Sequence, residues 1–202
     1  MSIAEKFDEI AKLVYEKGRQ DEWSDFWDSF QKNSGYMGNY ASIFSYEHWD
    51  ENNYNPKHTI GPTYSCNAMF YASHITDTKV TIDLRLCTYT NQMFLSAKKL
   101  KTIRKIIVKE ATTYTSAFGG CSALENITFE GIIGQNISFA DSPLLTVESM
   151  INDEGTGIIN CLKDFVSEGN TTTCTLTLHA DAKARLTDAQ KAVATEKGWT
   201  LA

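Results

Sequence analysis

The clearest unit of a fourfold repeat in this chain reads Ser116-Ala-Phe-Gly-Gly-Cys-Ser-Ala-Leu-Glu-Asn-Ile-Thr-Phe129. The other three units are centred on Phe70, Phe94 and Phe139. The phenylalanines at 70, 94, 118 and 139 are therefore 24, 24 and 21 residues apart. A period of this length is typical of proteins built from stacked repeats rather than of an ordinary globular domain.

Each unit carries the same apolar positions after its phenylalanine. A small residue follows three positions later and an aliphatic residue five or six positions later: Ser73, Ala97, Cys121 and Ser142, then Ile75, Leu100, Leu124 and Leu145. In the first three units an alternating run follows, which predicts a strand with one buried face. The fourth unit runs into Pro143 and lacks this alternation. One unit cannot bury its apolar face alone, so the units are predicted to stack around the phenylalanine and aliphatic positions.

The unit resembles the BspA-like leucine-rich repeat, whose usual form is roughly AF-x-x-C-x-x-L-x-x-I-x-I. We therefore expect an α/β repeat solenoid, in the form of a short leucine-rich-repeat β-solenoid. A helical and aromatic N-terminal cap is expected over residues 1–60, the solenoid over 61–150, and a mixed α/β C-terminal cap over 151–202. Within the first cap, Ser2-x-x-Glu5 forms a capping box and Phe44 marks a degenerate first unit.

The C-terminal residues predict several short elements. Thr146-x-x-Ser149 predicts a helix start, Ile158, Ile159, Leu162 and Phe165 recur at helical spacing, and Thr173-Cys-Thr-Leu-Thr-Leu178 alternates as a strand. Thr187-x-x-Gln190 is a capping box, and Trp199-Thr-Leu201 predicts a final edge strand. The ending from Leu186 to Ala202 resembles the closing module of BspA-like proteins encoded in phages and prophages of gut Firmicutes. That resemblance implies a tail-associated or host-contacting role.

Charge and composition limit the partners and the compartment. The net charge of −6 argues against nucleic acid as a partner, because phosphate binding needs a positive field. No apolar run approaches the length of a membrane span, so no membrane insertion is expected. The first residues lack a secretory pattern and no wall-anchoring signal follows. We expect a protein that is cytoplasmic when made and then virion-associated or released by lysis.

The sequence offers no recognisable catalytic motif. It has no phosphate-binding glycine loop, no G-x-S-x-G and no H-E-x-x-H. The five cysteines contain no C-x-x-C, so we expect free thiols and neither a metal nor a cofactor. Isolated carboxylates on strands are usually a solvated face, and the recurring asparagines Asn67, Asn91 and Asn136 are expected to cap neighbouring turns. An enzyme is not expected.

The expected function is non-catalytic recognition of a protein or glycan ligand on a bacterial surface. Outward strand positions are the candidate ligand-binding residues: Lys79, Thr81, Asp83, Lys105, Lys109, Thr128 and Glu130. One alternative is a structural virion or tail component that assembles through its caps, with no external ligand and with homo-oligomerisation. A carbohydrate-active protein is a second alternative, which would use exposed tryptophans and carboxylates on a glycan.

Overall fold

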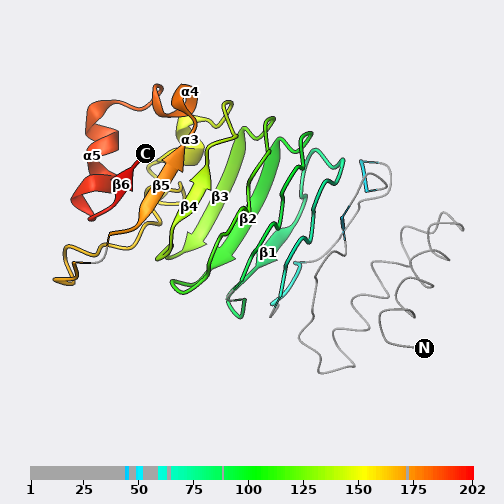
Figure 1. Cartoon of the computed structure of the whole chain (residues 1–202), viewed down its shortest axis with the longest axis horizontal. Coiled ribbons are helices and arrows are strands. Elements are labelled where there is room, and N and C mark those ends of the chain that lie inside the picture. Colours follow the sequence, from blue (N-terminus) through cyan, green and yellow to red (C-terminus); the bar gives the residue numbers. More distant parts are fainter. Residues whose placement is uncertain (1–43, 46–48, 52–58, 63–64, 88, 172) are drawn as a thin grey trace, which may run out of the picture.

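A computed structural model describes residues 44–45, 49–51, 59–62, 65–87, 89–171 and 173–202 (Figure 1). Most of the predicted N-terminal cap, including its capping box at Ser2 and Glu5, lies outside the described residues. Within the described part of the chain, none of the helices has the length and apolar composition that crossing a bilayer requires.

The described strands form two parallel sheets of three strands each. The first sheet contains, in this order, β1 (Thr81–Asp83), β2 (Thr102–Val108) and β3 (Asn126–Gly131). The second contains β4 (Ile137–Phe139), β5 (Thr175–Leu178) and β6 (Thr200–Leu201). The described helices are short: α3 (Val147–Met150), α4 (Ala180–Lys183) and α5 (Asp188–Glu196). All three lie in the C-terminal part of the chain (Figure 1).

The predicted leucine-rich-repeat β-solenoid is wrong. Instead of one continuous stack of strands, the described residues form two small open sheets, neither closed nor curled, with few helices. The break occurs at the fourth unit, where no strand follows Leu145. Thr146 instead accepts a hydrogen bond from the Ser149 amide and starts helix α3. The second sheet begins at the phenylalanine of the fourth unit, because Phe139 itself lies in β4.

The phenylalanines of successive units do stack on one another, as their spacing predicts. The ring centroids of Phe70 and Phe94 are 5.0 Å apart, those of Phe94 and Phe118 5.8 Å, and those of Phe118 and Phe139 4.6 Å. Phe44 stacks on Phe70 at 5.1 Å, which agrees with its interpretation as the mark of a degenerate first unit. We call these five side chains the phenylalanine stack.

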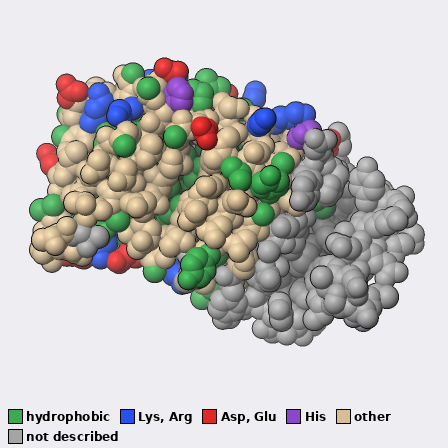
Figure 2. Space-filling model, viewed as in Figure 1, with side chains coloured by type: hydrophobic (Ala, Val, Ile, Leu, Met, Phe, Trp, Pro, Cys, Tyr) green, Lys and Arg blue, Asp and Glu red, His purple; other side chains and the backbone are tan. Residues whose placement is uncertain are grey.

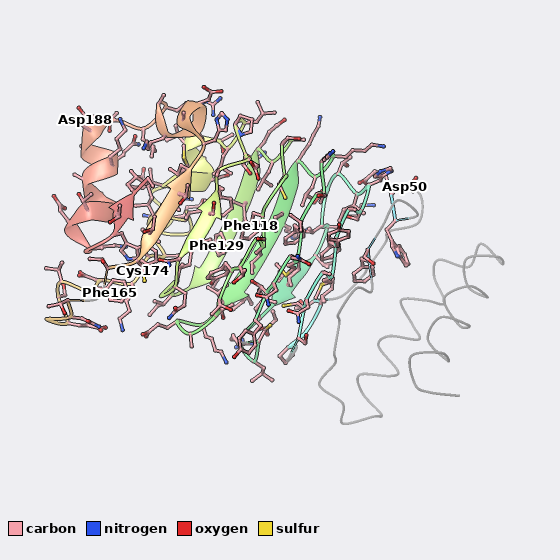
Figure 3. The ribbon with its side chains drawn as sticks, in the orientation of Figure 1. Asp50, Phe118, Phe129, Phe165, Cys174 and Asp188 are labelled. Carbon is pink, nitrogen blue, oxygen red and sulfur yellow. The ribbon has the colours of Figure 1, made fainter. Side chains whose placement is uncertain are left out.

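The remaining repeat positions fill the core around this stack. All four small residues and all four aliphatic residues named from the sequence are fully buried. Phe129 of β3 meets Phe118 edge to face, with centroids 6.5 Å apart (Figure 3). Residues of the first sheet and of the phenylalanine turns therefore pack into one apolar layer, and the predicted core is confirmed.

The phenylalanine turns share an unusual backbone conformation. The residue two positions before the phenylalanine has a positive φ in three successive units: 52° at Ala68, 57° at Gln92 and 50° at Ser116. Two positions after the phenylalanine, Ser96 has a φ of 64° and Gly120 a φ of 68°. Glycine adopts this conformation without steric cost, whereas other residues are strained in it. Gly120 of the third unit thus adopts without strain the conformation that Ala72 and Ser96 adopt in the first two units.

The capping motifs predicted in the C-terminal region are confirmed, but the helix predicted over residues 158–165 is wrong. Thr187 and Gln190 form a reciprocal capping box at the start of α5. Residues 158–165, in contrast, form turns, because their backbone pairs with Ile133: the Ile133 amide donates to the Cys161 carbonyl, and the Lys163 amide donates to the Ile133 carbonyl. The helical spacing of apolar residues there reflects burial without a helix.

Candidate binding face

The outward side of the β1–β2–β3 sheet carries most of the polar side chains that the sequence singled out. Ile82, Ile103, Ile106, Ile127 and Phe129 point into the core. The alternate positions of the same strands remain half-buried or exposed, and we call them the outer face: Thr81, Arg104, Lys105, Ile107, Asn126, Thr128 and Glu130.

Strand register aligns these side chains in rows across the sheet. Thr81 of β1 is paired with Lys105 of β2. Ile107 of β2 is paired with Glu130 of β3. Neighbouring strands lie about 4.8 Å apart, so one row of three side chains spans roughly 10 Å. The Lys105 ammonium reaches across to the Glu130 carboxylate at 2.8 Å, which links the two rows.

A bulge in β2 brings two basic residues onto the outer face. The register with β3 shifts between Ile103 and Ile106, so two residues of β2 stand opposite Thr128 alone. Arg104 is exposed, and its guanidinium donates to the Lys79 carbonyl oxygen at 3.1 Å.

Glycine is required at position 131, where the pairing of β2 with β3 ends, because a Cβ at Gly131 would lie 2.2 Å from the Val108 carbonyl oxygen.

Six of the seven predicted ligand-binding residues lie on or beside this face and are half-buried or exposed. Thr81, Lys105, Thr128 and Glu130 belong to the strands themselves. Lys79 lies in the turn before β1, with its ammonium 3.6 Å from the Glu51 carboxylate. Lys109 follows the last residue of β2 and is half-buried. The predicted outward position of these six residues agrees with the structure, and their role in ligand binding stays a prediction.

Asp83 differs from these six residues in exposure: the register places it in one row with Ile107 and Glu130, but its side chain is buried. Its exposed fraction is 3%, and the Arg85 guanidinium donates to both of its carboxylate oxygens at 2.7–3.2 Å. Burial alone would raise the pKa of Asp83, but hydrogen bonds from the Arg85 side chain and backbone outweigh this and hold the pKa below its ordinary value of 3.8. Asp83 therefore holds the exposed Arg85 side chain in place through these hydrogen bonds.

The Asp83–Arg85 pair should make stability depend on pH in acid. A carboxylate with a lowered pKa stabilises the fold above its unfolded pKa, and this contribution is lost as the pH falls through the folded pKa. We expect the wild-type unfolding free energy to drop below about pH 4 more steeply than that of Asp83→Asn, which lacks the titrating group. Urea midpoints of both proteins at neutral and acidic pH measure the difference, and parallel pH profiles would contradict the assignment.

Among the polar residues of the outer face, Arg104 and Asn126 are the two that were not predicted as binding candidates. Strict alternation places Arg104 and Lys105 on opposite faces of β2, so only one of them is expected to point outward. The signal is present, however, in the pattern Ile103-Arg-Lys-Ile106, where two polar residues separate two apolar ones. Such a spacing in a strand is what a bulge produces.

The outer face presents charged, amide and hydroxyl side chains that can form hydrogen bonds. Across the described ranges, histidine, cysteine, aspartate and glutamate side chains do not gather in groups of three or more that would hold a metal ion. On the side of the molecule shown in Figure 2, the described charged side chains lie mainly along the margins, and both signs are present. The recurring asparagines act in part as expected, since the Asn136 side chain accepts from the Thr175 amide at 2.7 Å.

Comparison of the chain with protein-family models, curated proteins and solved structures found no match.

Proposed function

We propose that this protein is a non-catalytic recognition module that binds a protein or glycan on a bacterial surface through its outer face. The observation that carries the proposal is the set of polar side chains that three paired parallel strands present on one face, namely Thr81, Arg104, Lys105, Asn126, Thr128 and Glu130. The resemblance of the repeat units and of the ending to BspA-like proteins of phages and prophages supports a host-surface ligand.

The chemistry of the outer face suits a polar macromolecular ligand. Arg104 is exposed and presents a planar fork of N–H donors, which favours carboxylates and sugar hydroxyls. Asn126 and Thr128 add groups that both donate and accept hydrogen bonds. Binding energy at such surfaces is concentrated in a few residues, and arginine is among the residue types enriched there.

Reversal of the Lys105–Glu130 ion pair tests the proposal directly. An exposed ion pair of this kind contributes at most about 1 kcal/mol to stability, so the double variant Lys105→Glu, Glu130→Lys should fold normally. It keeps the net charge but reverses the pattern that a ligand meets. We expect its affinity for target cells to fall by about tenfold or more, measured with labelled protein on intact bacteria.

The matched control reverses a second ion pair away from the outer face. Asp188 and Lys191 form a 3.3 Å pair on α5, which lies beyond the second sheet from β1, β2 and β3 (Figure 1). Asp188→Lys, Lys191→Asp should leave cell binding unchanged. Equal binding by both double variants and wild type would refute the outer face as the binding site. The absence of binding to any cell would favour the alternative of a structural component that assembles with other copies or with virion proteins.

A further inference from the structure

Two of the five cysteines, Cys66 and Cys87, lie in direct contact with each other, in the units of Phe70 and Phe94. Cys66 Sγ and Cys87 Sγ are 2.9 Å apart, and both residues are fully buried. Cys87 Sγ also lies 2.9 Å from the Tyr89 carbonyl oxygen, and Cys66 Sγ lies 3.6 Å from the same oxygen. Both thiols are free in this structure. A disulfide bond is about 2.05 Å long, so the two sulfur atoms need to approach by less than about 1 Å to form one.

The other three cysteines are in different surroundings. Cys121 Sγ donates to the Phe94 carbonyl at 3.2 Å, Cys161 Sγ to the Gly155 carbonyl at 3.6 Å, and Cys174 Sγ to the Gly134 carbonyl at 3.5 Å. Burial raises the pKa of Cys121 to about 12 and that of Cys161 to about 11, which suppresses their thiolates. The Cys66–Cys87 contact is therefore a specific feature and not the result of cysteine content.

Within the pair, Cys87 is the thiol that ionises more readily. Its hydrogen bond with Cys66 lowers the pKa of Cys87 below its ordinary value, against the opposing effect of burial. The same hydrogen bond, together with burial, raises the pKa of Cys66. A thiolate attacks an oxidant and a neighbouring thiol then resolves the product, so the two cysteines have distinct roles available.

We propose that Cys66 and Cys87 are a site of reversible oxidation, at which a small peroxide converts the two thiols into an intramolecular disulfide. The Cys87 thiolate attacks one oxygen of hydrogen peroxide; the O–O bond breaks, hydroxide leaves, and Cys87 becomes a sulfenic acid. The Cys66 sulfur then attacks the Cys87 sulfur, the S–O bond breaks, and the thiol proton leaves with the hydroxyl as water. Two thiols and one peroxide thus give one disulfide and two waters.

The disulfide would link the unit of Phe70 covalently to the unit of Phe94. Cys66 directly precedes the turn that contains Phe70, and Cys87 precedes the turn that contains Phe94. The bond closes a loop between two segments that already share backbone hydrogen bonds, such as the Phe70 amide to the Met93 carbonyl at 2.7 Å. Oxidation should therefore raise the melting temperature of the protein without a change in fold.

Mass spectrometry and thiol titration of the full chain test the proposal. After peroxide treatment we expect the number of free thiols to fall from five to three, with a cross-linked peptide pair that contains Cys66 and Cys87. A thiol reductant should restore all five. Five free thiols after treatment, or a disulfide that involves any other cysteine or a second chain, would overturn the proposal.

Two variants separate the roles of the cysteines. In Cys66→Ser the hydroxyl can still hydrogen-bond to Cys87 but cannot resolve its sulfenic acid, so dimedone should label Cys87 after peroxide treatment. In Cys121→Ala, the matched control, the Cys66–Cys87 disulfide should form to the same extent as in wild type. Dimedone labelling at Cys121, Cys161 or Cys174 in place of Cys87 would overturn the assignment of Cys87 as the attacking thiol.

Discussion

Phe118→Ala is expected to destabilise the protein by about 3–5 kcal/mol, the usual cost of removing a buried phenylalanine side chain. Phe118 is 1% exposed and lies in the middle of the phenylalanine stack. Its ring contacts Phe94 on one side and Phe139 on the other, and Phe129 meets it edge to face. The alanine variant would leave a cavity at the point where the first sheet and β4 share their core. Urea unfolding followed by circular dichroism measures the loss.

The control for this variant is an apolar residue outside the core. Val166 is 58% exposed, so Val166→Ala should change the unfolding free energy by no more than about 0.5 kcal/mol. An unfolding midpoint of Phe118→Ala equal to that of wild type would show that the stack does not hold the two sheets together.

Trp199→Ala is the second substitution with a large expected effect, again about 3–5 kcal/mol. Trp199 is 3% exposed, and its ring lies against Phe165 with centroids 5.8 Å apart. Its indole N–H donates to the Lys163 carbonyl oxygen at 2.8 Å. Next to it, the Lys197 ammonium donates to three carbonyl oxygens, those of Ile159, Asn160 and Leu162, at 2.7–3.1 Å. These contacts attach α5 and β6 to the turns over residues 158–165.

Trp199→Phe separates the two contributions of the indole. The phenyl ring retains much of the packing against Phe165 but strands the Lys163 carbonyl, which should cost about 1–3 kcal/mol. Thermal unfolding of both variants under the same conditions gives the comparison. If Trp199→Phe is as unstable as Trp199→Ala, ring packing does not stabilise the fold more than the indole hydrogen bond does, contrary to our expectation.

The core of this protein could be predicted from its sequence, because a repeat constrains many positions at once. The spacing of Phe70, Phe94, Phe118 and Phe139 places equivalent residues on top of one another, and their burial follows from stacking alone. The capping box at Thr187 and Gln190 could also be predicted from the sequence, since it depends on two side chains within one helical turn.

The split into two sheets could not be predicted from the repeat, because it depends on where the repeat stops. After Leu145 the backbone turns into α3, and the groups at the edge of β3 find other partners: the Ile127 amide donates to Ser149 Oγ and the Phe129 amide to the Thr156 carbonyl. Such pairings join irregular segments that are distant in the sequence, and no local sequence pattern predicts them. The strands β5 and β6 were identified locally, but the pairing of β4 with β5 and of β5 with β6 was not.

The candidate site was predictable as a face but not in its details. Alternation in β2 and β3 separates inward from outward residues, which is why Lys105, Thr128 and Glu130 were placed correctly. The burial of Asp83 was not predicted, because it depends on the Arg85 side chain folding back over it. That contact involves a flexible side chain two residues away, and strand periodicity carries no information about it.

The measurement that tests the central claim most directly is capture of the labelled wild-type protein on intact Gram-positive gut bacteria, before and after the cells are shaved with protease. The proposal predicts saturable binding that the reversal of Lys105 and Glu130 weakens. Binding that survives shaving would identify a wall glycan as the ligand, and binding that is lost would identify a surface protein. Failure to bind any of these cells, shaved or unshaved, would contradict recognition of a bacterial surface as the function of the outer face.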